Sequence, residues 1–145
     1  MQPFSYNVSF HVSHPNIDPD RITESLCLKP TLQCRVGDQK KTPAGSPLSG
    51  EYTATHWYCD LPHVDGLQLS VFLQSVVKRL GSHRHFLQEI CASGGSLEIS
   101  IGWYSGINSG DEFQWALLKE LSDLQISVSL DIYADAVSLD SASET

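Results

Sequence analysis

Four short segments of the chain alternate apolar and polar residues, the pattern of a strand with one side in a core and the other in water. The segments are residues 4–13, 56–61, 96–103 and 125–133. On each of them the polar side is rich in Ser, His, Asn, Asp and Tyr. We therefore predict a sheet with an uncovered polar face, and this face is where we expect a partner to bind.

Between these segments the apolar residues recur with a helical period. One stripe comprises Leu69, Phe72, Leu73, Val76, Val77 and Leu80, spaced as on one side of an amphipathic helix that Gly81 would end. A short helix is predicted near residues 84–92. Another is predicted to open at Asp111, because acids favour the first turn.

The residues between the first two predicted strands also predict the start of a helix. Asp18 can serve as the N-cap, and Pro19 then occupies the first helical position, where its missing N–H costs nothing. Pro30 bars extension of this short helix.

These elements predict an α+β, ferredoxin-like fold: a four-stranded, mainly antiparallel sheet with helices on one face and a helical insert between strands two and three. Residues 4–28 and 96–124 follow the same strand-then-helix order and are interpreted as related strand–helix–strand units. We expect one domain over residues 1–137 and a frayed tail over residues 138–145, which lacks any apolar stripe.

Residues 29–55 are predicted to form a long irregular connection, because they hold six prolines and glycines. The segment also carries four of the nine basic residues of the chain. A loop of this length within a compact domain is usually functional or disordered. We expect a mobile tip over residues 39–52.

Composition and charge exclude some classes of binding partner. The 145 residues carry a formal net charge of −8, and residues 86–145 hold ten acids against one lysine. An acidic surface repels phosphate backbones and anionic lipid, so we expect neither nucleic acid nor a membrane as partner, and a basic protein would fit. No apolar run approaches the ~20 residues of a membrane span, and the first residues lack a secretory pattern, so we expect a cytoplasmic protein.

The spacing of the cysteines, histidines and glycines does not indicate a metal site, a cofactor site or a catalytic centre. The four cysteines show no CxxC pair and are expected to be free thiols. The six histidines do not match the spacing of a zinc site, and no nucleophile elbow or phosphate-binding glycine motif is present. We predict no metal and no cofactor, and the sequence favours a protein without catalytic activity.

One resemblance covers residues 4–134. The runs HPNIDPDRI (14–22), LCLKPT (26–31) and RVGD (35–38), followed by Trp57 and by the closing helix and strand, resemble a bacterial family known as domain of unknown function 4279. The resemblance implies the fold and a bacterial origin. It implies no activity, because the family has no agreed function and no catalytic residue to carry over.

The main hypothesis is a small protein-binding domain, in one form an immunity or inhibitor protein, that acts through the polar face of its sheet. The residues expected to make this contact are His11, Tyr58, Glu98, Asp131 and Tyr133.

The alternative is a protein that binds a small anionic ligand, or an unrecognised enzyme. In that case loop 29–55 would close as a lid, and the residues expected at the ligand are Arg35, Lys40, His56 and Asp60. A concave site would favour this alternative and a flat one the main hypothesis. The sequence predicts no oligomeric state.

Overall fold

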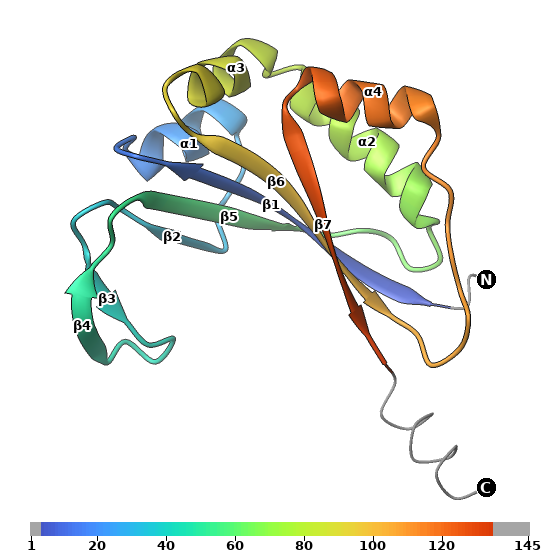
Figure 1. Cartoon of the computed structure of the whole chain (residues 1–145), viewed down its shortest axis with the longest axis horizontal. Coiled ribbons are helices and arrows are strands. Elements are labelled where there is room, and N and C mark those ends of the chain that lie inside the picture. The colour runs from blue at the N-terminus through green and yellow to red at the C-terminus, as the bar shows by residue number, and fades with distance from the viewer. Residues whose placement is uncertain (1–3, 135–145) are drawn as a thin grey trace, which may run out of the picture.

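The computed structural model describes residues 4–134, which form a main sheet with helices on one face and a separate two-stranded sheet (Figure 1). The elements are β1 (Ser5–His14), α1 (Pro19–Leu26), β2 (Leu32–Cys34), β3 (Gln39–Lys41), β4 (Pro47–Glu51), β5 (Thr55–Leu61), α2 (Leu69–Gly81), α3 (Arg84–Ala92), β6 (Ser96–Tyr104), α4 (Trp115–Asp123) and β7 (Ile126–Tyr133). The tail predicted at 138–145 lies outside the described residues.

The first strand of the chain lies at the centre of the main sheet, whose strand order is β2-β5-β1-β6-β7. Both neighbours of β1 run antiparallel to it, and β2 runs antiparallel to β5. In contrast, β7 runs parallel to β6. The helices of the described chain all lie on one side of this sheet, as Figure 1 shows, which leaves the other side open.

The predicted ferredoxin-like, four-stranded, mainly antiparallel sheet is wrong, because the main sheet has five strands and is mixed. The direction of a strand depends on the end of the sheet at which the chain enters it. The alternation of apolar and polar residues does not predict this. Thr55, where β5 begins, lies opposite His14 at the end of β1, so β5 runs antiparallel. Ile126, where β7 begins, lies opposite Leu97 near the start of β6, because α4 carries the chain back first. The two predicted strand–helix–strand units are therefore not repeats.

The connection predicted to be irregular, residues 29–55, contains three short strands. β2 extends the main sheet beside β5, and β3 and β4 pair with each other. Every residue of β3 and β4 is exposed. Because neither strand buries one of its sides, their sequences show no alternation of apolar and polar residues that would predict them.

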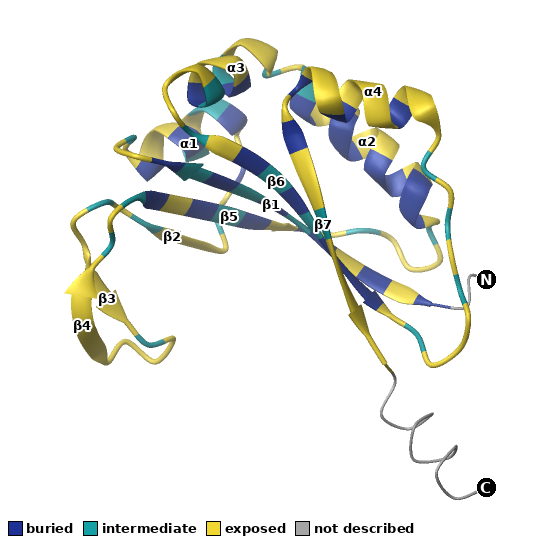
Figure 2. Cartoon of the chain, in the orientation of Figure 1, coloured by how far each residue is buried: buried dark blue, intermediate teal, exposed yellow. Residues whose placement is uncertain are grey.

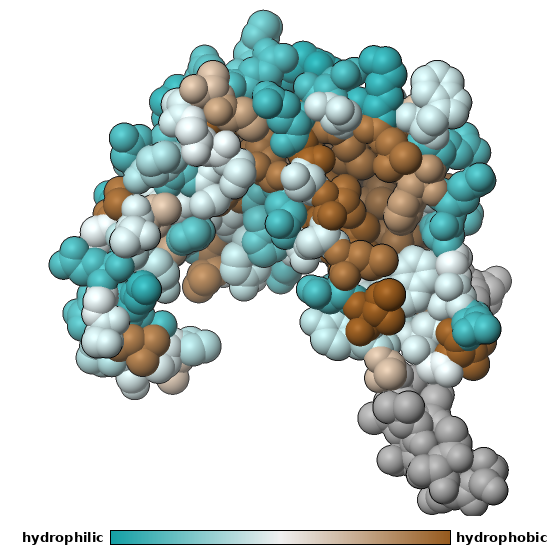
Figure 3. Space-filling model, in the orientation of Figure 1, coloured by the Kyte–Doolittle hydropathy of each residue, from teal (hydrophilic) through white to brown (hydrophobic). Residues whose placement is uncertain are grey.

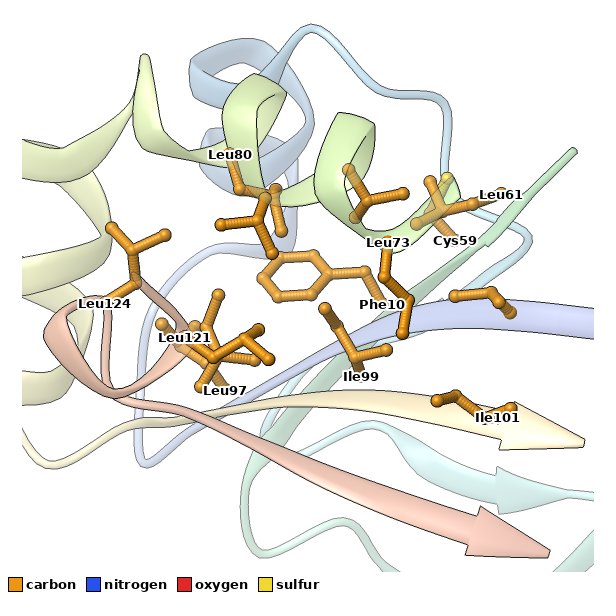
Figure 4. Close-up of a cluster of buried hydrophobic side chains, with 14 of the residues drawn as sticks. Phe10, Cys59, Leu61, Leu73, Leu80, Leu97, Ile99, Ile101, Leu121 and Leu124 are labelled. Atoms are coloured by element: carbon orange, nitrogen blue, oxygen red, sulfur yellow. The ribbon is translucent and has the colours of Figure 1, made fainter. Parts of the chain in front are cut away.

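The core lies between the main sheet and the helices. Buried and exposed residues alternate along β1 and β5, as Figure 2 shows. Phe10 of β1 is fully buried and points toward Leu73 and Leu80 of α2, with Leu97 and Ile99 of β6 beside it (Figure 4). The predicted stripe of α2 is confirmed, since all six of its residues are buried and the helix ends at Gly81.

The predicted start of α1 is also confirmed. The Asp18 carboxylate accepts the backbone N–H of Asp20 at 3.0 Å, and Pro19 is the first helical residue. The predicted helix at Asp111 begins four residues later, at Trp115.

Candidate functional site

The polar residues of four strands gather on the side of the main sheet that faces away from the helices, which we call the open face. Its members are Ser5, Asn7, Ser9, His11, Ser13, His56, Tyr58, Asp60, Ser96, Glu98, Ser100, Tyr104, Ser127, Ser129, Asp131 and Tyr133. Figure 1 shows the β3–β4 hairpin projecting at one end and the end of β7 at the other, so the open face lies on the inside of an arch.

Three of the predicted contact residues meet at one end of the open face. The rings of His11 and Tyr58 stack with their centroids 4.9 Å apart and their planes 14° apart, and Glu98 lies directly opposite His11 on β6. Together with Ser13 and His56 they line a shallow hollow of about 160 Å³.

Hydrogen bonds hold this end of the open face in place. The Ser9 hydroxyl and His11 Nε2 are 2.8 Å apart, and the Ser129 hydroxyl donates to Glu98 Oε1 at 2.9 Å. Both the imidazole and the carboxylate are therefore oriented before any partner arrives, which lowers the entropy cost of binding.

A second aromatic pair lies at the other end. Tyr104 and Tyr133 stack with centroids 4.9 Å apart and planes 11° apart, and Asn7 Nδ2 donates to the Tyr104 hydroxyl at 2.9 Å. Asp131 lies next to Gly102 on β6, two residues before Tyr133. All five predicted contact residues thus lie on one face, but at two ends of it.

The residues of the ligand-binding alternative do not converge. The Arg35 guanidinium bonds Asp18 Oδ1 at 2.8 Å, on the start of α1. Lys40 lies 5.9 Å from the ring centroid of Tyr52 on the hairpin side. Of the four predicted residues only His56 lines the hollow, while Asp60 is exposed four residues further along β5.

Three of the four cysteines are poorly suited to act as nucleophiles. Burial raises the pKa of the Cys34, Cys59 and Cys91 thiols, which disfavours the reactive thiolate. Within residues 4–134, no three His, Cys, Asp or Glu side chains are placed to hold a metal ion. A larger hollow of about 600 Å³ lies on the helix side, between α2 and α4. Its polar lining residues are Gln74, Lys78, Arg84, Gln114 and Glu120, none of which was predicted as a site residue.

Sequence reasoning missed the residues that orient the site. Alternation places Ser9, Ser129, Asn7 and Tyr104 on the polar side of their strands, but none of them is among the predicted contact residues. Their roles depend on which strands are neighbours, and a single sequence does not contain that information.

A family model described as a domain of unknown function (DUF4279) matches residues 4–135. The chain belongs to the DUF4279 family. The resemblance predicted from the sequence is therefore confirmed, and the DUF4279 match includes every strand of the open face. No curated protein and no solved structure shows significant similarity to the chain. Among the described residues of this DUF4279 protein, no helix has the length and apolar character needed to cross a membrane.

Proposed function

We propose that this domain binds another protein through its open face and has no catalytic role of its own. The observation that carries the proposal is the pre-ordered, half-exposed array of His11, Tyr58 and Glu98. Small-molecule sites are typically enclosed and of roughly 300–1,000 Å³, whereas the hollow at this array holds about 160 Å³ and is open. A wide, shallow surface with fixed aromatic side chains suits a protein partner better.

The charge of the open face supports a basic partner. The four long strands of the main sheet contain no Lys or Arg, and they carry Asp60, Glu98 and Asp131. Arg35, which the ligand-binding alternative placed at the site, is bound to Asp18 instead. A partner with Lys or Arg at its contact surface would therefore meet no repulsion here.

The tyrosines at both ends of the open face would supply most of the contact area. Tyr104 and Tyr133 are 39% and 48% exposed although they stack on each other. Tyr is enriched among the residues that dominate binding energy, because it offers a large surface with few rotamers. In the immunity or inhibitor form of the proposal, the same surface would cover the active site of a basic toxin enzyme.

The test is affinity capture from the source cells followed by reconstitution of the purified pair. Glu98→Lys and Tyr58→Ala should each weaken binding about tenfold or more. Glu112→Lys is the matched control, because it makes the same charge change on the loop before α4 and should leave the affinity unchanged.

Two outcomes would overturn the proposal. One is that no reconstituted partner responds to Glu98→Lys or Tyr58→Ala. The other is that a small anion raises the melting temperature of the protein and this shift is lost in His56→Ala, which would support the ligand-binding alternative. The inhibitor form requires in addition that the wild-type protein suppress the activity of the captured enzyme.

A further inference from the structure

The last strand of the described chain has an outer edge to which no other strand of residues 4–134 is bonded. On the edge of β7 that faces β6, the Tyr133 carbonyl accepts the Ser105 N–H at 3.2 Å. Backbone groups of a strand point alternately to its two edges, and the β6–β7 register runs without a break from Leu97 to Tyr104. The N–H and C=O groups of Val128, Leu130 and Ile132 therefore point to the free edge.

The side chains of the same three residues are exposed on the helix side of the sheet. Val128, Leu130 and Ile132 are 42%, 48% and 71% exposed, whereas their register partners on β6 are at most 8% exposed. Figure 2 shows the change along β7 from a buried start to an exposed remainder. The strand thus presents free backbone groups and apolar side chains on one edge.

Helix α4 continues this apolar surface. Leu118 is 49% exposed and Trp115 77% exposed, and both lie on the side of α4 away from Ala116 and Glu120, which face α2 across a hollow. Figure 3 shows hydrophobic side chains gathered below α4 and along β7. We call the surface formed by Val128, Leu130, Ile132, Leu118 and Trp115 the β7 edge.

Free edges in monomeric proteins are usually protected by Lys, Pro or a bulge, because they otherwise recruit another strand. Strand β7 contains no Lys and no Pro, and its pairing with β6 shows no bulge. Its one charged residue, Asp131, points to the open face rather than outward along the edge.

We propose that the β7 edge binds an extended segment of a partner protein in which apolar and basic residues alternate, as an added strand of the sheet. Its apolar side chains would cover Val128, Leu130 and Ile132, and its Lys or Arg side chains would lie on the open face near Asp131. Charge complementarity argues for this occupant. Residues 111–134 hold five acids against Lys119, and Lys119 is already paired with Asp123 at 2.9 Å. A second copy of this acidic chain would instead bring like charges together.

This surface goes beyond the open face, because it uses backbone groups and the helix side of the sheet. The probe is a capped nine-residue peptide of alternating Val and Lys, with Val–Glu and non-alternating Val–Lys peptides for comparison. Fluorescence anisotropy with the full chain should show binding of the alternating Val–Lys peptide, at least about tenfold tighter than either comparison.

Two variants of one residue test the geometry. Leu130→Lys places a charge against the apolar side chains of the peptide, and Leu130→Pro removes an outward N–H while leaving the ladder to β6 intact. Each should weaken peptide binding about tenfold or more. Leu32→Lys is the matched control, because Leu32 is 57% exposed on the opposite edge strand, β2. It should leave binding unchanged, as should Tyr58→Ala on the open face.

The inference would be overturned by equal binding of all three peptides, by loss of binding in Leu32→Lys, or by a wild-type dimer, measured by sedimentation, that Leu130→Lys dissociates. The last would make a second copy the occupant. Loss of peptide binding in Tyr58→Ala would also contradict the β7 edge while leaving the proposed function of the open face standing.

Discussion

The Asp111 carboxylate accepts the backbone N–H of Ser70 at 2.8 Å, so the first turn of α2 is capped by a residue 41 positions further along the chain. Its other oxygen accepts the Gln68 side-chain amide at 3.1 Å. Gln68, at the N-cap position of α2, makes no capping bond of its own. Asp111 therefore ties the loop before α4 to the start of α2, and this role explains why it does not open α4.

Replacing Asp111 with Ala should lower the free energy of unfolding by about 1 kcal/mol, because a helix N-terminal N–H then loses its acceptor. Urea denaturation of both proteins would measure the difference. Glu112→Ala is the matched control, since it removes the same charge from the next, exposed position, and it should change stability by less than about 0.5 kcal/mol. Equal effects of the two substitutions would contradict a capping role.

His14 should make the protein less stable in mild acid. Its Nδ1 accepts the N–H groups of Asn16 at 3.1 Å and Ile17 at 2.9 Å, which requires a neutral ring. Burial, and to a lesser extent the charge of Arg21, lowers the His14 pKa from its usual 6.5. The unfolded chain therefore binds a proton more readily than the folded one.

The stabilising contribution of His14 is complete above about pH 6.5 and is lost progressively as the pH falls from there toward the lower folded-state pKa. The melting temperature should fall over this window. His14→Asn, whose amide oxygen can also accept an N–H, should flatten that dependence, and the exposed His85→Asn should not. A wild-type profile that stays level between about pH 7 and pH 5 would refute the assignment.

Two glycines should respond in opposite ways to Ala. A Cβ at Gly95 would lie 2.8 Å from the backbone oxygens of both Ile90 and Ser13, so Gly95→Ala should destabilise by about 1–3 kcal/mol. A Cβ at Gly81 meets nothing within 4 Å, and Gly81→Ala in α2 should stabilise by about 0.5–1 kcal/mol. Thermal denaturation of the pair would check both signs, and tolerance of Ala at position 95 would contradict the tight approach.

Gln125 holds a left-handed backbone conformation, with φ of 59°, directly after α4. This conformation costs a non-glycine residue about 1–2 kcal/mol, and the greater flexibility of glycine in the unfolded chain offsets part of it. Gln125→Gly should therefore raise the free energy of unfolding by about 0.5–1 kcal/mol. Gln125→Ala keeps the strain and serves as the control, so an equal gain from both would contradict this explanation.

The local features of the fold could be predicted from the sequence because they depend on neighbouring residues. The capping of α1 by Asp18 and the buried stripe of α2 are of this kind. The parallel direction of β7 is not, because it follows from the path of the chain through α4. Alternation along residues 125–133 puts Leu130 on the side expected to face the core, yet Leu130 is 48% exposed because β7 is an edge strand.

The sequence predicts that the candidate site lies on the polar face of the sheet, but it does not predict which side chains of that face meet. Alternation put His11, Tyr58 and Glu98 on the polar side of their strands. Their meeting depends on register, which pairs His11 with Tyr58 on one side and with Glu98 on the other. The Ser129 hydroxyl reaches Glu98 only because β7 lies beside β6.

The central position of β1 has a consequence for synthesis on the ribosome. Strand β1 is made before the other described strands, but its pairing with β6 joins Ser5 to Tyr104. At roughly 5–20 residues per second, about 5–20 s pass before that partner exists, and further chain must then leave the exit tunnel. During this time β1 lacks the second of its two neighbouring strands, so one of its edges is unpaired, and folding should be slow because most of its strand pairing is distant.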